Sequence, residues 1–527
     1  MPHMQESRSR ESAIKPAKLD WPVFGVSGGV IVLFMVASLI DIGTVSAIVD
    51  AAFAFSVKYF GPFWQVLLLA TFGVSMALAF SRFGNVRLGG TNTPEMSTFR
   101  WLAIIMCTLL AAGGVFWSFA EPMYHFMTVP PSFLGVDAAT PAAVGPALAQ
   151  AHHHWGFLSW AIIGTLGSIV AMYTHYHLGL PLKPRSLLYP VLGERALHGW
   201  IGTAVDAASI LAVAAGTIGP IGFLGLQLSY SLEQLMGIPD VYATQLTIVA
   251  ALVAIYTISA ITGITRGIQI LSRFNVLLAV ALLAIIILTG PGGFVIDAFF
   301  TSFGLYLNNF FTIATNRSDP TWLGAWSIFF GGWFLGYGPL TAMFIARISR
   351  GRTIREMMVA IAIVAPIVTN FWFTILGGAG IYYELASPGS VSGPLNDGGL
   401  PATMLAVVQQ LPLAGLLVPA FLVLIVVFLA TTGDSMSFTM AMAVSGSDSP
   451  PTSVRIFWAV MMGAVAAILL RLGDGGITAL QSFIVVTAVP VSLILLPLLW
   501  TAPKVARELA TEQFGKVEGT VARTPAD

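Results

Sequence analysis

Long apolar runs recur along almost the whole chain, and each is long enough to cross a lipid bilayer as a helix. Only 9% of the 527 residues are charged, whereas a soluble domain carries roughly 25%. A chain with so few charges cannot cover a water-facing surface of its own size. The sequence therefore predicts an all-α polytopic membrane protein.

Proline, glycine and charged residues divide the apolar runs into twelve predicted spans, numbered here in chain order. The spans centre near residues 34, 70, 110, 165, 213, 252, 280, 336, 369, 428, 463 and 489. The stretch Gly293–Phe311 is apolar but contains Asp297 and two asparagines, so we expect an external helix lying along the surface. The predicted organisation is a tail over residues 1–20, a transmembrane domain over 21–501 and a short tail over 502–527.

The positions of lysine and arginine predict the orientation of the chain. With the N-terminus inside, only Lys58, Arg317 and Arg471 of the 24 basic residues lie outside, which leaves 21 inside. Cytoplasmic loops carry such an excess of positive charge. We therefore expect both termini in the cytoplasm and a location in the bacterial inner membrane. The equal number of 24 acidic residues gives no indication of a nucleic-acid partner.

Two predicted spans contain residues that weaken a helix. Span three contains Gly113–Gly114 and ends at Glu121–Pro122, and span eight contains Gly331–Gly332 and Gly338–Pro339. Proline frees backbone groups that a bilayer tolerates only beside protein or a water-filled cavity, whereas glycine alone can serve close helix packing.

The two spans are five apart and so cross the membrane in opposite directions. Interrupted helices at matching places in two inverted halves are typical of the binding site of a secondary transporter. We expect spans three to seven and eight to twelve to form two inverted repeats, with spans one and two peripheral to them.

Three consecutive histidines, His152–His154, lie at the outer end of span four. Neighbouring residues on a helix are about 100° apart, so they do not point at one metal ion. The sequence also places no Asp, Glu or Cys within one helical turn of them. We therefore expect interfacial or helix-capping histidines rather than a metal site.

Aromatic residues of spans three, four and eight form the strongest candidate for a binding site. Tryptophans at a membrane interface often form an aromatic belt, but Trp160 lies more than a turn below Trp155. These two are about 140° apart on a regular helix, so they line one cavity only if it wraps the helix or the helix is irregular. Several aromatic faces suit a quaternary ammonium, which has no N–H group to satisfy. The candidate substrate-binding residues are Trp155, Trp160, Trp333, Phe334, Tyr337, Trp117 and Phe116.

Four motifs together resemble the betaine/choline/carnitine transporter (BCCT) family. They are "MFIARISRGRTIREM" from Met343 to Met357, "HWGFLSWAI" in span four, "LKPRSLLYPVLGERA" after it and "FLATTGDSMS" in span ten. The resemblance implies a LeuT-type fold of two inverted five-helix repeats, assembled as a homotrimer in the lipid bilayer. It also implies uptake of small trimethylammonium or sulfonium compounds, most often driven by sodium.

The resemblance assigns Trp155, Trp160 and Trp333 to the family's aromatic cage. Ile163 stands where related members often have tyrosine, and Phe334 and Tyr337 stand where many have tryptophan. The cage is therefore altered. The solute remains open among glycine betaine, choline, carnitine and dimethylsulfoniopropionate.

The sodium site implied by the resemblance lies in span ten. Phe428, Thr431 and Thr432 match the family's sodium-binding positions, and Thr217 in span five is a candidate second ligand. Alternatively, threonine hydroxyls in a membrane helix bond to a carbonyl of their own helix. Asp434 is an intramembrane carboxylate and a candidate coupling group, with a structural cap or a salt bridge as the alternatives.

The leading hypothesis is a secondary transporter that imports an onium solute by sodium symport, with no cofactor other than the sodium ion. Proton-coupled uptake would require Asp434 or Glu121 to titrate, and sodium-independent exchange lacks an arginine in span five to replace the ion. A membrane-embedded enzyme is disfavoured because the carboxylates are scattered. A passive channel is disfavoured by the interrupted helices and the bulky rings.

Overall fold

The computed structural model describes residues 19–109, 113–262, 265–446, 450–472 and 476–515. Within these ranges every regular element is a helix, and an isolated antiparallel bridge joins Arg87 to Thr353. Ten helices in these ranges are long and apolar enough to cross a membrane, and α13 with α14 gives an eleventh when that bent pair is counted as one span. The all-α membrane fold is therefore confirmed.

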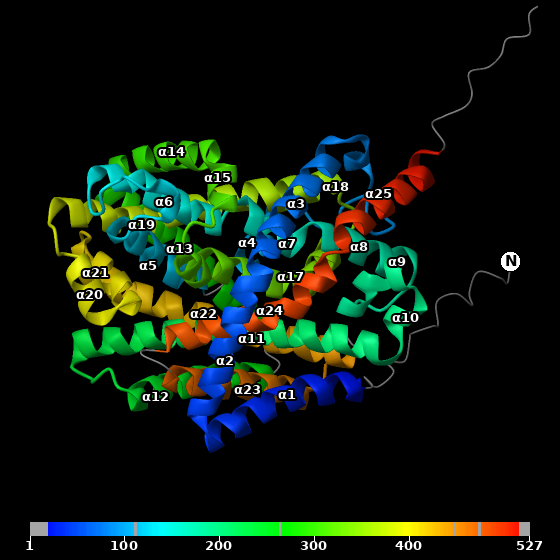
Figure 1. Cartoon of the computed structure of the whole chain (residues 1–527), viewed down its shortest axis with the longest axis horizontal. Helices are drawn as coiled ribbons and strands as arrows, with labels where there is room; N and C mark the ends of the chain where they lie inside the picture. Colours follow the sequence, from blue (N-terminus) through cyan, green and yellow to red (C-terminus); the bar gives the residue numbers. More distant parts are fainter. Residues whose placement is uncertain (1–18, 110–112, 263–264, 447–449, 473–475, 516–527) are drawn as a thin grey trace, which may run out of the picture.

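Helices occupy the predicted spans along the chain (Figure 1). Residue 110, the predicted centre of span three, lies outside the described residues, between α4 and α5. Neither α4 nor α5 is long enough to cross a membrane alone, so the number of twelve spans stays a prediction. In chain order the spans comprise α1 (Trp21–Ile40); α2 (Ile42–Phe55) and α3 (Gly61–Phe80); α4 (Thr98–Leu109) and α5 (Gly113–Met127); α6 (Val144–His154), α7 (Phe157–Gly164) and α8 (Leu166–Met172); α11 (Gly199–Met236); α12 (Tyr242–Thr262); α13 (Thr265–Thr289); α17 (Phe329–Ile348); α18 (Ile354–Val359) and α19 (Ala365–Ala386); α22 (Ala414–Ser445); α23 (Thr452–Arg471); and α24 (Ile477–Leu495).

Helix α14 (Gly292–Asn308) corresponds to the predicted external helix. It turns by 105° from the end of α13 and packs across α6 and α19. A turn of this size takes the chain out of the direction of the preceding span, as expected of a helix lying along the surface.

The packing partners of the spans support two inverted five-helix repeats. Helix α5 of span three packs against α19 of span nine, and α17 of span eight packs against α7 and α8 of span four. Likewise, α11 of span five packs against α24, and α13 of span seven packs against α22. An inverted repeat exchanges spans three to seven with spans eight to twelve in order. This exchange turns the contact of spans three and nine into that of spans eight and four, and the contact of spans five and twelve into that of spans ten and seven. Helices α12 and α23 exchange with each other, and they pack together.

The predicted helix break at Gly338–Pro339 is wrong. Helix α17 continues through both residues to Ile348, and α5 likewise continues through Pro122 to Met127. The glycines of span eight serve packing instead: a Cβ on Gly338 would lie 2.8 Å from Leu495, and one on Gly332 would lie 2.8 Å from Trp64. The helix therefore continues although Pro339 removes one hydrogen bond, and the glycines allow its neighbours to pack closely.

The loops at the two ends of the spans lie on opposite sides of the molecule (Figure 1). The short helices α9 (Tyr189–Leu192) and α10 (Glu194–Leu197) lie on the right, as does the far end of α25 (Leu498–Phe514). The helices α20 (Ser392–Gly398) and α21 (Thr403–Gln410) lie on the left. Helix α25 extends to Phe514, and the side-chain amide of its Gln513 donates to the Arg87 carbonyl oxygen at 2.6 Å.

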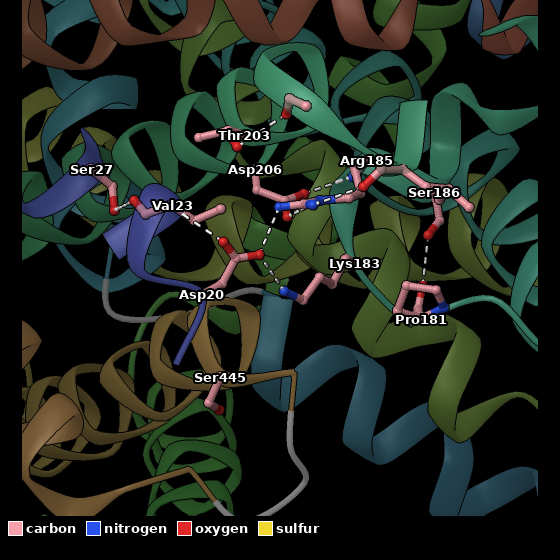
Figure 2. A network of polar contacts seen from close by, with 12 residues as sticks. Asp20, Val23, Ser27, Pro181, Lys183, Arg185, Ser186, Thr203, Asp206 and Ser445 are labelled. Carbon is pink, nitrogen blue, oxygen red and sulfur yellow. Dashed lines mark hydrogen bonds and ion pairs between the residues drawn. The ribbon is translucent and has the colours of Figure 1, made fainter. Parts of the chain in front are cut away.

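An ion-pair network joins the start of α1 to the loop after span four and to α11 (Figure 2). The Arg185 guanidinium bonds to Asp206 at 2.6 Å and to Asp20 at 2.9 Å, and Lys183 bonds to Asp20 at 3.0 Å. The backbone N–H of Asp20 also donates to the Val444 carbonyl oxygen of α22 at 2.9 Å. Partial burial raises the pKa of the Asp20 carboxyl, but the hydrogen bond and charge of Lys183 and the charge of Arg185 hold it below its ordinary value.

The contact between α5 and α19 depends on Gly377, because an alanine Cβ there would lie 2.4 Å from the Pro122 ring and 2.8 Å from the Ser118 carbonyl oxygen. We expect Gly377→Ala to destabilise the protein by about 1–3 kcal/mol, the usual cost of overpacking. Gly378→Ala is the matched control, since its Cβ would meet Thr374 at an ordinary 3.6 Å. Thermal unfolding of the purified variants measures the difference. Equal melting temperatures for the two variants would contradict the prediction.

Candidate substrate and ion site

Span four is irregular between His154 and Phe157, and Trp155 lies at this break. Helix α6 ends at His154 and α7 begins at Phe157, with Gly156 at φ −99° and ψ −146° between them. A Cβ on Gly156 would lie 2.1 Å from the His152 carbonyl oxygen, so glycine is needed for this close approach. The helix therefore departs from the ideal geometry, which is one of the two conditions under which Trp155 and Trp160 were expected to share a cavity.

Four aromatic rings surround Trp155. The centroid of the Trp155 ring lies 5.4 Å from that of Phe330, 5.9 Å from that of Trp333 and 5.4 Å from that of Phe334, all in span eight. The fourth ring, Phe373 of α19, lies 4.8 Å away, and all five side chains are buried. Trp155, Trp333 and Phe334 were predicted from the sequence, whereas Phe330 and Phe373 were missed. Phe330 precedes Phe334 by one helical turn, which is a signal for it, but Phe373 lies in a span that showed no motif.

Span five fixes the position of the span-eight rings. The Trp333 indole N–H donates to the Gly216 carbonyl oxygen at 3.1 Å. A Cβ on Gly216 would lie only 2.8 Å from the Tyr337 ring, so glycine lets this ring pack closely against span five. The Tyr337 hydroxyl lies 3.5 Å from the Thr217 hydroxyl. Trp333, Tyr337 and Thr217 are thus brought together at the contact of α11 with α17.

The other predicted aromatic residues lie further from Trp155. Trp117 contacts Phe330 at 5.2 Å, and Phe116 stacks on Phe223 at 5.4 Å, so both form a layer behind the first rings. Trp160 in α7 is buried, and in the described part of the chain its ring contacts none of the other rings and its indole N–H has no hydrogen-bond partner.

The span-ten residues predicted to bind sodium lie together on α22. The Thr431 hydroxyl donates to the carbonyl oxygens of Val427 at 2.9 Å and Phe428 at 3.0 Å, and Thr217 donates to Val213 at 2.8 Å. These bonds match the alternative of hydroxyls bonded to their own helix. A hydroxyl that donates its hydrogen keeps its lone pairs, so these oxygens still fit a small hard cation. Thr432 on the next position is buried.

Asp434 lies in an ion pair with Arg455 of α23 at 3.1 Å, and the Arg455 guanidinium also stacks over the Phe438 ring at 5.2 Å. These contacts correspond to the salt-bridge alternative for this carboxylate.

The expectation that the three histidines are interfacial or capping is wrong, because all three are buried. His152 bonds to the Thr374 hydroxyl at 2.9 Å. His154 bonds to Glu121 at 2.5 Å, and His125 lies 3.5 Å from the same carboxylate oxygen. Sequence spacing along span four misses this cluster because Glu121 and His125 come from span three.

Several known proteins are similar to this chain over nearly its whole length. The model of the BCCT family, described as betaine/carnitine/choline family transporters, matches residues 22–511. Glycine betaine transporter 2 of Vibrio parahaemolyticus serotype O3:K6 is 51% identical over 502 residues, which cover 95% of this chain and 93% of that protein. The ectoine/hydroxyectoine transporter of Virgibacillus pantothenticus is 30% identical and covers 91% of this chain and 95% of its own.

A solved structure of a Na⁺-coupled sialic acid symporter in a substrate-bound outward-open state aligns with a TM-score of 0.44 at 17% identity, over 88% of this chain and 92% of that one. The sequence relatives are named transporters, which confirms the prediction of a transporter rather than an enzyme. With the family model matching nearly the whole transmembrane domain, the chain belongs to the betaine/carnitine/choline transporter (BCCT) family.

Proposed function

We propose that this protein imports glycine betaine, or a closely related trimethylammonium solute, by sodium symport across a bacterial inner membrane. The observation that carries the proposal is the group of rings around Trp155, which combines Phe330, Trp333, Phe334 and Phe373 at a helix break. Each good aromatic face contributes roughly 0.5–2 kcal/mol to the binding of a cation that has no N–H donor. The 51% identity to a glycine betaine transporter supports the choice of solute.

Sodium is the proposed coupling ion because neighbouring oxygen donors on α22 suit a small cation. The Phe428 carbonyl and the Thr431 hydroxyl lie 3.0 Å apart on this helix, whereas Thr217 lies beside Tyr337 at the contact of α11 with α17. Proton coupling is disfavoured at Asp434, because that carboxylate is already paired with Arg455. Each positive charge that moves inward gains about 2.3 kcal/mol per 100 mV, which is enough to concentrate the solute. The proposed assembly is a homotrimer in the lipid bilayer with both termini in the cytoplasm.

Uptake into proteoliposomes tests the proposal. The panel is labelled glycine betaine, choline, carnitine, dimethylsulfoniopropionate and ectoine, each with and without an inward sodium gradient. We expect glycine betaine to accumulate only when sodium is present. Accumulation driven by a proton gradient alone would contradict sodium symport, and accumulation of none of the panel would contradict the choice of substrate class.

The sodium site gives a second prediction. We expect Thr431→Ala to raise the sodium concentration for half-maximal uptake about ten-fold, the effect of losing roughly 1.4 kcal/mol of ion binding. Thr431→Ser keeps the oxygen and should stay near wild type. Thr439→Ala is the matched control, since its hydroxyl also bonds to its own helix, at Ser435. Equal effects of the alanine and serine variants would show that the hydroxyl does not bind the ion.

A further inference from the structure

A buried carboxylate lies directly behind the Trp155 ring. The indole N–H of Trp155 donates to Glu121 Oε2 at 2.9 Å, and Glu121 Oε1 bonds to His154 Nδ1 at 2.5 Å. Glu121 is fully buried, His154 is 2% exposed and Trp155 is 3% exposed. Hydrogen bonds in such buried surroundings are strong and directional. We propose that Glu121 is a positioning residue, whose carboxylate fixes the orientation of the Trp155 ring in the solute cage; this inference rests on the function proposed above.

The bonds of His154 assign the proton on its ring. If Nδ1 donates to Glu121, Nε2 accepts through its single lone pair, which the Ser327 hydroxyl at 2.8 Å and the Gln150 amide nitrogen at 3.0 Å share. A neutral ring therefore accounts for these contacts. Ser327 lies in the π-helical turn Gly324–Ile328 at the start of span eight, so the network joins spans three, four and eight at the cage.

The position of Trp155 explains why it needs such a partner. It lies at the break between α6 and α7, with φ −106° and ψ 14°, so regular helix geometry does not set the direction of its side chain. Its contacts with the neighbouring rings are apolar and only weakly directional. The indole N–H is the one donor of the side chain, and Glu121 is its acceptor.

The same cluster has the composition of a metal site, since ligand atoms of Glu121, His125 and His154 lie within 4.8 Å of one another. The hydrogen bonds favour positioning, because His154 already uses both ring nitrogens and Glu121 uses both oxygens. His125 is different: within the described residues neither of its ring nitrogens has a hydrogen-bond partner.

Transport kinetics of Glu121→Gln form the first test. The two carboxylate oxygens accept separately from Trp155 and from His154, whereas glutamine places an NH2 group, which can only donate, at one of the two positions. We expect the KM for glycine betaine to rise about ten-fold, the ratio expected for losing one buried hydrogen bond. His153→Gln is the matched control, since this buried neighbour makes no bond to Glu121.

A double-variant cycle separates positioning from a general structural effect. Trp155→Phe keeps a ring but removes the N–H, so Glu121→Gln should add little to the KM in that background. A full ten-fold rise in both backgrounds would overturn the inference. A metal ion retained by the wild-type protein and lost in Glu121→Gln would also overturn it, because the carboxylate would then be a ligand.

Indole NMR of the wild-type protein tests the bond even if Glu121→Gln fails to fold or no solute of the panel is transported. The chain has 13 tryptophans, and the signal lost in Trp155→Phe identifies the Trp155 N–H. We expect this signal well downfield, as for a proton donated to a carboxylate. An unshifted Trp155 signal would overturn the inference. A downfield signal together with no uptake of any solute would instead refute the proposed function.

Discussion

Replacing Trp155 with alanine should strongly reduce the accumulation of glycine betaine at solute concentrations near the KM of the wild-type protein. The side chain touches Phe330, Trp333, Phe334 and Phe373, so its removal takes away one wall of the cage and lets the others shift. We expect the KM to rise roughly 100-fold, which corresponds to about 2.7 kcal/mol and exceeds the value of one aromatic face. Labelled uptake into proteoliposomes and calorimetric binding of the solute measure this effect.

Two variants control the Trp155 experiment. Trp155→Phe keeps a ring in the cage and should lose much less affinity. Trp458→Ala removes an equally buried indole that contacts Phe24 and Phe457, far from the candidate site in the sequence and outside its ring group. A large cavity costs about 3–5 kcal/mol of stability wherever it lies. If both alanine variants lose uptake equally, the loss reflects stability and the cage assignment is wrong.

Replacing Arg185 with methionine should produce the largest loss of stability. The guanidinium bonds to Asp206, which is fully buried, and to Asp20 at the start of α1 (Figure 2). Methionine leaves the Asp206 carboxylate buried without its ion-pair partner, although the backbone N–H at position 185 still donates to it. Breaking a buried ion pair in this way costs about 3–5 kcal/mol. Thermal unfolding of the purified protein should show a large fall in melting temperature.

Two further variants give the Arg185 prediction its specificity. Arg185→Met with Asp206→Leu removes both charges and should recover most of the lost stability, because an apolar pair can replace a buried ion pair. Lys183→Met should cost less, because Asp20 keeps its bond to Arg185. A double variant as unstable as Arg185→Met alone would show that the charge of Asp206 is not the cause.

The spans and the external helix were predictable because a bilayer imposes a length and a polarity on each element. A helix must stay apolar for its full crossing, and that requirement is written locally in the sequence. Asp297 indicated an external helix because it places a charge in an apolar stretch, and α14 does turn away from α13. The predicted aromatic residues of span eight also lie together, because Trp333 and Phe334 are neighbours on α17.

The breaks in the helices were not predictable from glycine and proline alone. Gly338 and Pro339 looked like an interruption, yet α17 continues because Leu495 packs against the glycine. The break lies instead at Gly156, where the His152 carbonyl approaches too closely for any side chain. Whether a glycine packs against a neighbour or allows a sharp turn depends on what lies beside it in space.

By itself the sequence determined the class of the protein, the order of its spans, the family and three of the five rings grouped around Trp155, because each depends on short stretches or on local apolarity. Only the tertiary structure placed Phe373 against Trp155, paired Arg185 with Asp206 and brought Glu121 to Trp155 and His154 across a separation of 33 residues. These contacts join different spans, and their partners are selected by helix packing. Burial then makes each polar contact obligatory, since an unpaired charge or donor in the bilayer is costly.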